Sequence, residues 1–258
     1  MLGAIIGDIV GSRFEFRNNT TDKDFELFTR QNSYTDDTIC TIAVADAITG
    51  GKSYKDSLLE WCRRYPHPMG AYGGGFARWI RSERPEPYNS FGNGSAMRVS
   101  PVAWAFDSLK DVLGEAAKTA EVTHNHPEGI KGAQTVAHAI WLLRRAKDMA
   151  AFANLIEAAY QGFRREYPAG VFDETCQGTV PVACKIICEA SGFEDAIRRA
   201  ILQGGDSDTI GAIVGGIAEA AFGIPSGIRD KALDYLPEEM IRVITIFAKN
   251  VEIRSKRR

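Results

Sequence analysis

The stretch that decides the fold is Gly204-Gly205-Asp206-Ser207-Asp208-Thr209, followed by Ile210-Gly211-Ala212-Ile213-Val214-Gly215-Gly216-Ile217-Ala218. The second half is apolar or small at every position, which is typical of a helix that is buried on all sides. Two carboxylates and a threonine hydroxyl therefore stand at the entrance to the protein core. Carboxylates in such a place are costly unless a cation meets them.

A second acidic cluster repeats this arrangement near the N-terminus. Tyr34-Thr35-Asp36-Asp37-Thr38 precedes the apolar run Ile39-Cys40-Thr41-Ile42-Ala43-Val44-Ala45. Each cluster alone is typical of a helix N-terminus, because Thr and Asp are good N-caps and acids there complement the helix dipole. Two clusters with the same Asp-Thr pattern instead favour a metal site.

The types of ligand atom limit which metal ions could bind. Like charges about 4 Å apart repel by roughly 4 kcal/mol at an effective dielectric near 20, so clustered carboxylates need a counter-charge. The two clusters supply four carboxylates and hydroxyls with no Cys or His among the ligand candidates. Such a set of hard oxygen ligands suits Mg²⁺ or Mn²⁺ and not Zn²⁺.

Helical periodicity dominates the rest of the chain. Ser53 is a predicted N-cap for a helix that ends near Tyr65-Pro66, and Pro127 opens a long helix that runs through Leu143. Further helices are predicted over 108–121, 151–165, 175–190, 193–203 and 238–251. Only 243–247 is ambiguous, because its β-branched residues also suit a strand. We therefore expect an all-α fold of about a dozen or more helices.

Bulk properties set the class of protein. No Pro/Ser-rich linker divides the 258 residues, so a single domain over 1–258 is expected. The net charge of −2 gives no electrostatic footprint for nucleic acid. The N-terminus lacks the basic region of a signal peptide, and no apolar run reaches the roughly 18 residues that span a bilayer. Five cysteines, an odd number, are interpreted as free thiols of a reducing cytosol, so a cytoplasmic protein is expected.

Two glycine-rich segments are candidate anion sites. Tyr72-Gly73-Gly74-Gly75-Phe76 could turn several N–H groups toward a phosphate, or could be a flexible turn. Ser90-Phe91-Gly92-Asn93-Gly94-Ser95-Ala96-Met97-Arg98 is the stronger candidate, because glycines before a helix start suit a pyrophosphate. Phe91 could cover a base or a ribose. Neither segment is a Walker loop or a dinucleotide fingerprint.

Two further residues have both a functional and an ordinary interpretation. His124, in Thr123-His124-Asn125-His126-Pro127, could donate to a phosphate or ribose, or could be a capping or core histidine. Glu15 follows a small-residue helix and, taken alone, is interpreted as a surface acid.

These pieces, in this order, resemble the ADP-ribosylglycohydrolase family from residue 3 to residue 223. The residues that carry the resemblance are Gly3 to Asp8, Thr35 to Thr38, Gly92 to Arg98, Thr123-His124, Phe172 to Pro181 and Gly205 to Gly211. The resemblance implies an all-α fold with two Mg²⁺ or Mn²⁺ ions. It implies that one ion binds Thr35, Asp36, Asp37 and Asp208, and that the other binds Asp206, Asp208 and Thr209. Asp208 would then bridge the ions.

The resemblance also implies roles for the remaining candidates. Glu15, Asp36 and Asp208 would be catalytic, with Glu15 on a mobile loop that serves gating or proton transfer. The ADP-ribose contacts would be Tyr72, Gly73, Gly74, Gly75, Ser90, Phe91, Asn93, Gly94 and His124. The metal-ligand residue types are all present, which argues against a catalytically inactive or crystallin-like relative.

The expected function is therefore metal-dependent hydrolysis of the bond between ADP-ribose and an acceptor, in a protein that is expected to be a monomer. ADP-ribosyl-arginine is the favoured substrate, but the sequence does not identify an acid that would hold the guanidinium. O-linked serine or small-molecule ADP-ribose and nucleobase-linked ADP-ribose stay open. A di-metal phosphohydrolase and a non-catalytic or crystallin-like ADP-ribose-binding protein are the competing classes.

Overall fold

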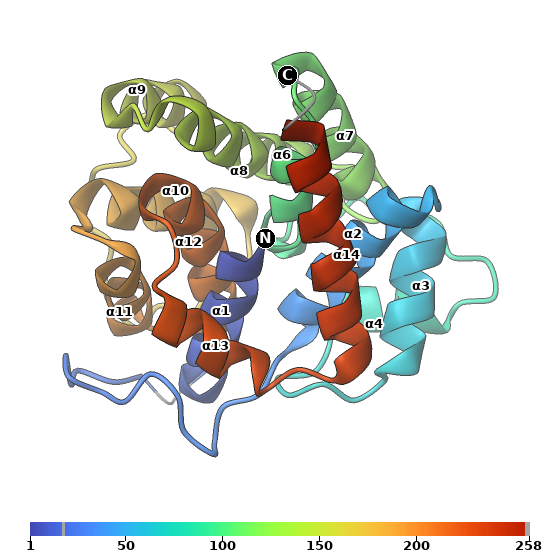
Figure 1. Ribbon diagram of the computed structural model, residues 1–258, viewed down its shortest axis with the longest axis horizontal. Coiled ribbons are helices and arrows are strands. Elements are labelled where there is room, and N and C mark those ends of the chain that lie inside the picture. Colours follow the sequence, from blue (N-terminus) through green and yellow to red (C-terminus); the bar gives the residue numbers. More distant parts are fainter. Residues whose placement is uncertain (17–18, 256–258) are drawn as a thin grey trace.

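The computed structural model describes residues 1–16 and 19–255 and consists of helices and loops (Figure 1). In the described residues there is no β-structure beyond two isolated bridges. The helices, in chain order, are α1 (Leu2–Gly11), the 3₁₀ helix η1 (Ser12–Phe14), α2 (Asp36–Gly50), α3 (Tyr54–Arg64), α4 (Gly74–Arg81), α5 (Gly94–Met97), α6 (Ser100–Ala105), α7 (Leu109–Glu121), α8 (Pro127–Ala146), α9 (Met149–Ala159), α10 (Cys176–Glu189), α11 (Phe193–Gln203), α12 (Ser207–Phe222), α13 (Ser226–Leu233) and α14 (Glu238–Ser255). The all-α prediction is confirmed.

Most predicted helices are found close to their predicted bounds. The side chain of Ser53 accepts a hydrogen bond from the Asp56 N–H and caps α3, as its sequence indicated. Pro127 occupies the first turn of α8, where its missing N–H is not needed. The ambiguous segment 243–247 lies inside α14, because Val243, Ile244 and Phe247 form one buried helical stripe.

The prediction for 151–165 was wrong at both ends. Helix α9 begins at Met149, because the Asp148 side chain accepts hydrogen bonds from the backbone N–H groups of Ala150 and Ala151. The helix ends at Ala159, three residues before Gly162, whose φ of +71° lies in the left-handed region. Capping by Asp148 was the signal that the periodicity alone did not reveal.

Helices α1 and α12 pack in the middle of the fold with their backbones in contact (Figure 1). Glycines at a spacing of four allow this approach. A Cβ atom on Gly7 would lie 1.8 Å from the Gly211 carbonyl oxygen, and one on Gly3 would lie 2.2 Å from the Gly215 carbonyl oxygen. Only residues without a side chain fit between these helices, so the small-residue runs in the sequence specify this contact.

Two isolated bridges between backbone segments join loops that are far apart in the sequence. A parallel bridge joins Thr35, just before α2, to Met69 in the loop before α4. An antiparallel bridge joins Gly92, before α5, to Thr175, before α10. Segments far apart in the sequence are thus held side by side at the N-terminal ends of four helices.

The glycine contact predicts a specific loss of stability. Gly7→Ala places a methyl group inside the Gly211 backbone, so the helices must separate, and we expect a destabilisation of about 3 kcal/mol. Gly114→Ala in α7 is the matched control, because a Cβ atom there meets no atom within 4 Å. That variant should gain about 0.5–1 kcal/mol from helix propensity. Urea unfolding measures both, and equal effects of the two substitutions would refute the proposed close contact.

Candidate active site

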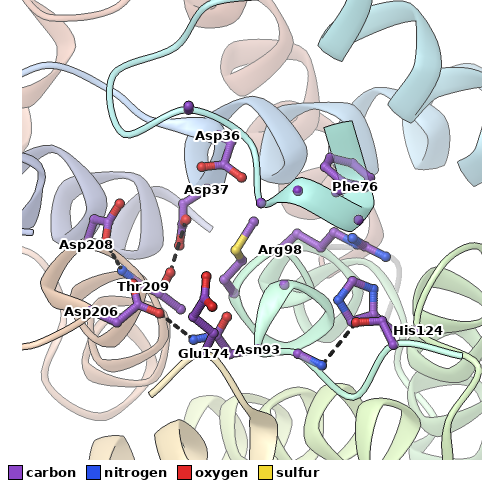
Figure 2. A pocket seen from close by; sticks show the side chains of 18 of the residues that line it. Asp36, Asp37, Phe76, Asn93, Arg98, His124, Glu174, Asp206, Asp208 and Thr209 are labelled. Carbon is purple, nitrogen blue, oxygen red and sulfur yellow. Dashed lines mark hydrogen bonds between the residues drawn. The ribbon is translucent and has the colours of Figure 1, made fainter. Parts of the chain in front are cut away.

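The two acidic clusters predicted from the sequence converge on one cavity of about 250 Å³. Asp36 and Asp37 begin α2, while Asp206 and Asp208 lie at the start of α12, and Figure 2 shows all four on the same side of the cavity. The lining residues are Glu15, Asp36, Asp37, Ala71, Gly73, Gly74, Gly75, Phe76, Tyr88, Ser90, Gly92, Asn93, Gly94, Met97, Arg98, His124, Phe172, Glu174, Asp206, Asp208 and Thr209.

The donor set fits divalent cations. Glu15, Asp206 and Asp208 each offer a carboxylate oxygen, and these three oxygens lie within 4.8 Å of one another. Asp37 Oδ1 is buried without a hydrogen-bond partner, whereas Asp37 Oδ2 accepts from the Thr209 hydroxyl at 3.3 Å. A buried carboxylate oxygen without a partner is costly in a folded protein unless a cation completes it. Hard carboxylate oxygens of this kind suit Mg²⁺ or Mn²⁺.

The electrostatics of the cluster point the same way. Burial, followed by the charges of neighbouring carboxylates, raises the pKa values of Asp36, Asp37 and Asp208 well above the ordinary range. Burial and the charge of Asp206 raise the pKa of Glu15 to about 8. No ion pair reaches any of these groups from the described residues. Cations bound between the carboxylates would reverse the direction of these shifts.

Asp206 is held by a neutral partner. Its Oδ2 accepts a hydrogen bond from Asn93 Nδ2 at 2.6 Å, and the same amide nitrogen donates to the Thr179 hydroxyl at 3.0 Å. Asn93 was predicted as a substrate contact, and the structure places it both on the cavity wall and against a candidate metal ligand. The amide therefore orients the carboxylate without neutralising its charge.

Glu15 lies at the mouth of the acidic cluster. It is half-buried and follows η1 directly. The loop before α4 packs against it: a Cβ atom on Gly70 would lie 2.5 Å from Glu15 Oε2, and Gly70 has a φ of +78°. The backbone conformation therefore favours glycine at this position, and a side chain there would displace the Glu15 carboxylate. The interpretation of Glu15 as an ordinary surface acid was wrong, because its carboxylate lines the cavity.

Asp8 is a buried acid that the sequence analysis missed as a site residue. It lies on α1, fully buried, and accepts hydrogen bonds from the backbone N–H groups of Thr35 and Thr38, each at 3.0 Å. Both threonine hydroxyls donate to it as well. Burial raises the pKa of Asp8 to about 6. Its place in the middle of an otherwise apolar helix was the available signal.

The Thr35 hydroxyl makes two hydrogen bonds in this network. It donates to Asp8 Oδ1 at 2.7 Å and accepts from the Asp37 N–H, which caps α2. These two hydrogen bonds leave one lone pair on the hydroxyl, but Thr35 is fully buried and is not among the residues that line the cavity. The ordinary role of a helix cap and the role of a ligand are thus compatible, and its metal role stays a prediction.

The opposite end of the cavity is built from the predicted glycine-rich segments. Gly73, Gly74 and Gly75 form the start of α4, and Gly92 and Gly94 flank Asn93. The Gly94 position is crowded, since a Cβ atom there would lie 3.1 Å from His124 Nε2 and would push on that ring. Backbone N–H groups at these helix starts can bind an anion. Ser90 also lines this end.

His124 is a neutral donor at this end. Burial, followed by the charge of Arg98, lowers its pKa well below the ordinary value. Arg98 Nη2 donates to the Thr123 hydroxyl at 2.9 Å, and that hydroxyl lies 2.7 Å from His124 Nδ1. The hydroxyl proton is then directed to Nδ1, so we assign the hydrogen of the neutral ring to Nε2. Nε2 faces the Gly92–Gly94 turn.

Two predicted substrate contacts do not line the cavity. The Tyr72 hydroxyl donates to the backbone carbonyl of Tyr65 at 2.7 Å, at the end of α3. The Phe91 ring is 44% exposed and packs edge-on against His126, with ring centroids 5.3 Å apart. Both residues adjoin lining residues in the sequence, but their side chains are directed elsewhere, so their contacts with ADP-ribose stay predictions.

The sequence analysis did not single out several lining residues. Arg98, which is buried, donates to the Thr119 carbonyl oxygen and to Thr123, and so braces the turn that carries His124. Glu174 and Phe172 come from the loop before α10. All three residues lie in segments that the sequence analysis describes as motifs. Their side chains could not be placed in the cavity without the fold.

The raised pKa values predict how stability depends on pH. Without metal, the acids bind protons more tightly in the folded than in the unfolded state, so the free energy of unfolding falls as the pH rises. Stability is lost over a pH range that begins at about 4, where the carboxyl groups of the unfolded chain titrate, and ends at about 8, the pKa of Glu15 in the folded protein. Thermal unfolding in EDTA at pH 5 to 8 measures this, and Mg²⁺ should stabilise most at pH 8.

Asp208→Asn is the matched variant for this experiment. Asn keeps the oxygen that accepts from the Thr209 N–H but removes one of the repelling charges. In EDTA the variant should melt higher than the unsubstituted protein at pH 8 and should show a smaller gain with Mg²⁺. A stability in EDTA that rises steadily to pH 8 would contradict the electrostatic account.

Comparisons with known proteins agree with this geometry. The ADP-ribosylglycohydrolase family model matches residues 1–257. The chain is 27% identical to the ADP-ribosyl-[dinitrogen reductase] glycohydrolase of Rhodospirillum rubrum, over 93% of this chain and 91% of that protein. It is 26% identical to ADP-ribosylhydrolase ARH3 of Danio rerio (88% and 82% covered) and 25% identical to ADP-ribosylarginine hydrolase Tri1 of Pseudomonas putida (87% and 70% covered).

A solved structure shows the same fold. It is titled "ADP-ribosylglycohydrolase-related protein complex" and superposes with a TM-score of 0.75 over 97% of each chain, at 23% identity. None of the helices in the described part of the chain is both long and apolar enough to cross a membrane. The match over nearly the whole sequence and the shared architecture show that this chain belongs to the ADP-ribosylglycohydrolase family and is a hydrolase of that family.

Proposed function

We propose that this protein hydrolyses the N-glycosidic bond between ADP-ribose and an acceptor arginine, with two Mg²⁺ or Mn²⁺ ions in its cavity. One observation carries the proposal: carboxylates from four separate segments face one end of a cavity whose other end is formed by glycine-rich helix starts. An ADP-ribose conjugate has the matching pattern, with a diphosphate and a hydroxyl-rich sugar. The relative named for ADP-ribosylarginine supports the choice of acceptor.

The residues that would hold the ions are those of the two acidic clusters. They are Thr35, Asp36, Asp37, Asp206, Asp208 and Thr209, with Asp208 shared. When bound, such ions position the sugar hydroxyls and lower the pKa of a bound water. The buried Asp37 Oδ1 without a partner is the observation that most directly supports a cation here.

The chain itself supplies charge, orientation and a site for the proton. Cleavage at the anomeric carbon passes through an oxocarbenium-like state, which nearby carboxylates stabilise. Asp206 is kept in place by Asn93, and Glu15 faces the same end of the cavity. Without cations the pKa of Glu15 is raised to about 8; cations held by the aspartates would lower it, and the Glu15 carboxylate would then be ionised and able to accept a proton from water.

The glycine end binds the rest of the substrate. Gly73 to Gly75 and Gly92 to Gly94 offer backbone donors to the diphosphate, and His124 offers its Nε2–H. Because Arg98 raises the positive potential beside a neutral histidine, this end favours an anion. We expect the protein to act as a monomer in the cytoplasm on ADP-ribosylated proteins or smaller conjugates.

A panel of defined linkages tests the proposal. The unsubstituted protein with Mg²⁺ should release free ADP-ribose from ADP-ribosyl-arginine, and EDTA should abolish the release. Asp208→Asn should lower turnover by at least about a thousandfold, because it removes the shared ligand charge. Asp230→Asn, which changes an exposed acid on α13, should keep full activity. Release is measured by chromatography of the nucleotide product.

The same panel separates the competing functions. Serine-linked and nucleobase-linked ADP-ribose test the other linkages, and cleavage of those alone would contradict the arginine assignment. Release of inorganic phosphate would indicate a di-metal phosphohydrolase. Binding of ADP-ribose without any turnover of the panel would indicate a non-catalytic ADP-ribose-binding protein.

A further inference from the structure

The cavity has opposite charge at its two ends. Figure 2 shows Asp36, Asp37, Asp206 and Asp208 on one side and Arg98 with His124 on the other. Arg98 is the one Lys or Arg among the lining residues of the described chain. Two divalent cations carry four positive charges and balance the four aspartates. The carboxylates of Glu15 and Glu174 are left over at the acidic end.

The backbone of Glu174 is held in place by a hydrogen bond, whereas its side-chain carboxylate has no hydrogen-bond partner among the described residues. Its backbone carbonyl accepts a hydrogen bond from the Asn93 N–H at 2.7 Å, next to the bridge between Gly92 and Thr175. The loop is therefore fixed to the wall of the cavity at Glu174 and directly after it. Its side chain lines the cavity and makes no hydrogen bond or ion pair with any other described residue.

The charge of Glu174 acts on its neighbours at the acidic end. It contributes to raising the pKa values of both Glu15 and Asp206. It is absent from the group of three carboxylates whose oxygens approach within 4.8 Å of one another. Glu174 thus lies within electrostatic range of the candidate metal ligands without belonging to that cluster.

An aromatic pair stands beside this carboxylate at the cavity mouth. Phe172 lines the cavity two residues before Glu174, and its ring stacks on that of Phe16, with centroids 5.5 Å apart and planes at 23°. The two side chains are 39% and 52% exposed, which is unusual for phenylalanine. Large exposed apolar side chains grouped at a cavity mouth indicate a binding surface.

We propose that Glu174 and Phe172 form the acceptor subsite and bind the guanidinium of ADP-ribosylated arginine. This inference rests on the function proposed above. A guanidinium is a planar cation that pairs with carboxylates through two hydrogen bonds and stacks on aromatic rings. A carboxylate and a partly exposed phenylalanine ring that line the same cavity, two residues apart, can meet both preferences. A serine acceptor is uncharged and would gain little from either group.

Binding of the released acceptor tests the subsite without turnover. Agmatine, an arginine analogue without the carboxylate, is titrated by calorimetry into the protein saturated with ADP-ribose. Glu174→Gln should weaken agmatine binding about tenfold or more and change the affinity for ADP-ribose alone less than twofold. Phe172→Ala should weaken agmatine binding several-fold. Glu189→Gln, an exposed acid at the far end of α10, is the matched control and should change neither affinity.

Kinetics give an independent readout. For arginine-linked ADP-ribose, Glu174→Gln should raise KM about tenfold or more with kcat little changed, because the group binds the acceptor and is not a metal ligand. If Glu174→Gln leaves both the agmatine affinity and the KM unchanged, the proposed subsite is wrong. Turnover by the unsubstituted protein would in that case leave the proposed function intact. A loss confined to kcat would also overturn it. If the unsubstituted protein does not cleave the arginine linkage, the proposed function itself fails.

Discussion

The site depends on the backbone contact between α1 and α12. Gly3, Gly7 and Gly11 face the backbone of Gly215, Gly211 and the Ser207–Asp208 peptide, and a Cβ atom at any of the three would overlap with it. This approach places the start of α12 against the end of α1. Asp208 is then fixed on one side of the cavity, while Asp8 on α1 reaches the turn that carries Asp36 and Asp37.

The cost of this arrangement is concentrated charge in the core. Asp8 is satisfied by two N–H groups and two hydroxyls, so its burial is compensated by hydrogen bonds. The cavity aspartates have fewer donors, and their pKa values are raised by burial and by one another. Two kinds of buried acid therefore coexist: Asp8 is stabilised by hydrogen bonds within the fold, and the cavity acids include a group, Glu15, Asp206 and Asp208, that could hold a metal ion. Active sites commonly retain unfavourable charge of this kind because the ligand compensates it.

The cavity is also divided along its length. Glycine-rich helix starts, the neutral His124 and the buried Arg98 form one end, and acids form the other. A substrate that carries a diphosphate and a cationic acceptor matches this division in charge at both ends. The fold obtains it by joining N-terminal helix ends from distant parts of the chain, so that the starts of helices and the loops before them line the site.

Much of this protein could be predicted from the sequence. Caps and periodicity predicted most helices, since those signals are local, and the Asp-Thr clusters before small-residue helices indicated the ligand chemistry. The helix at 149–159 was misplaced where an Asp cap outweighed the apolar pattern. Tyr72 and Phe91 show the limit of motif position, because neighbours in a lining segment can direct their side chains outward.

Residue types and local spacing by themselves determined the helical fold, the two acidic helix starts and the class of metal that suits them, because each depends on a few neighbouring residues. Only the tertiary structure decided that the clusters share one cavity, that Asp8 accepts hydrogen bonds from the N-terminal turn of α2 and that Glu174 and Phe172 line the same cavity. Those facts depend on the close packing of α1 on α12 and on two single backbone bridges, which join residues 34 and 83 positions apart. No local pattern in the chain encodes such distances.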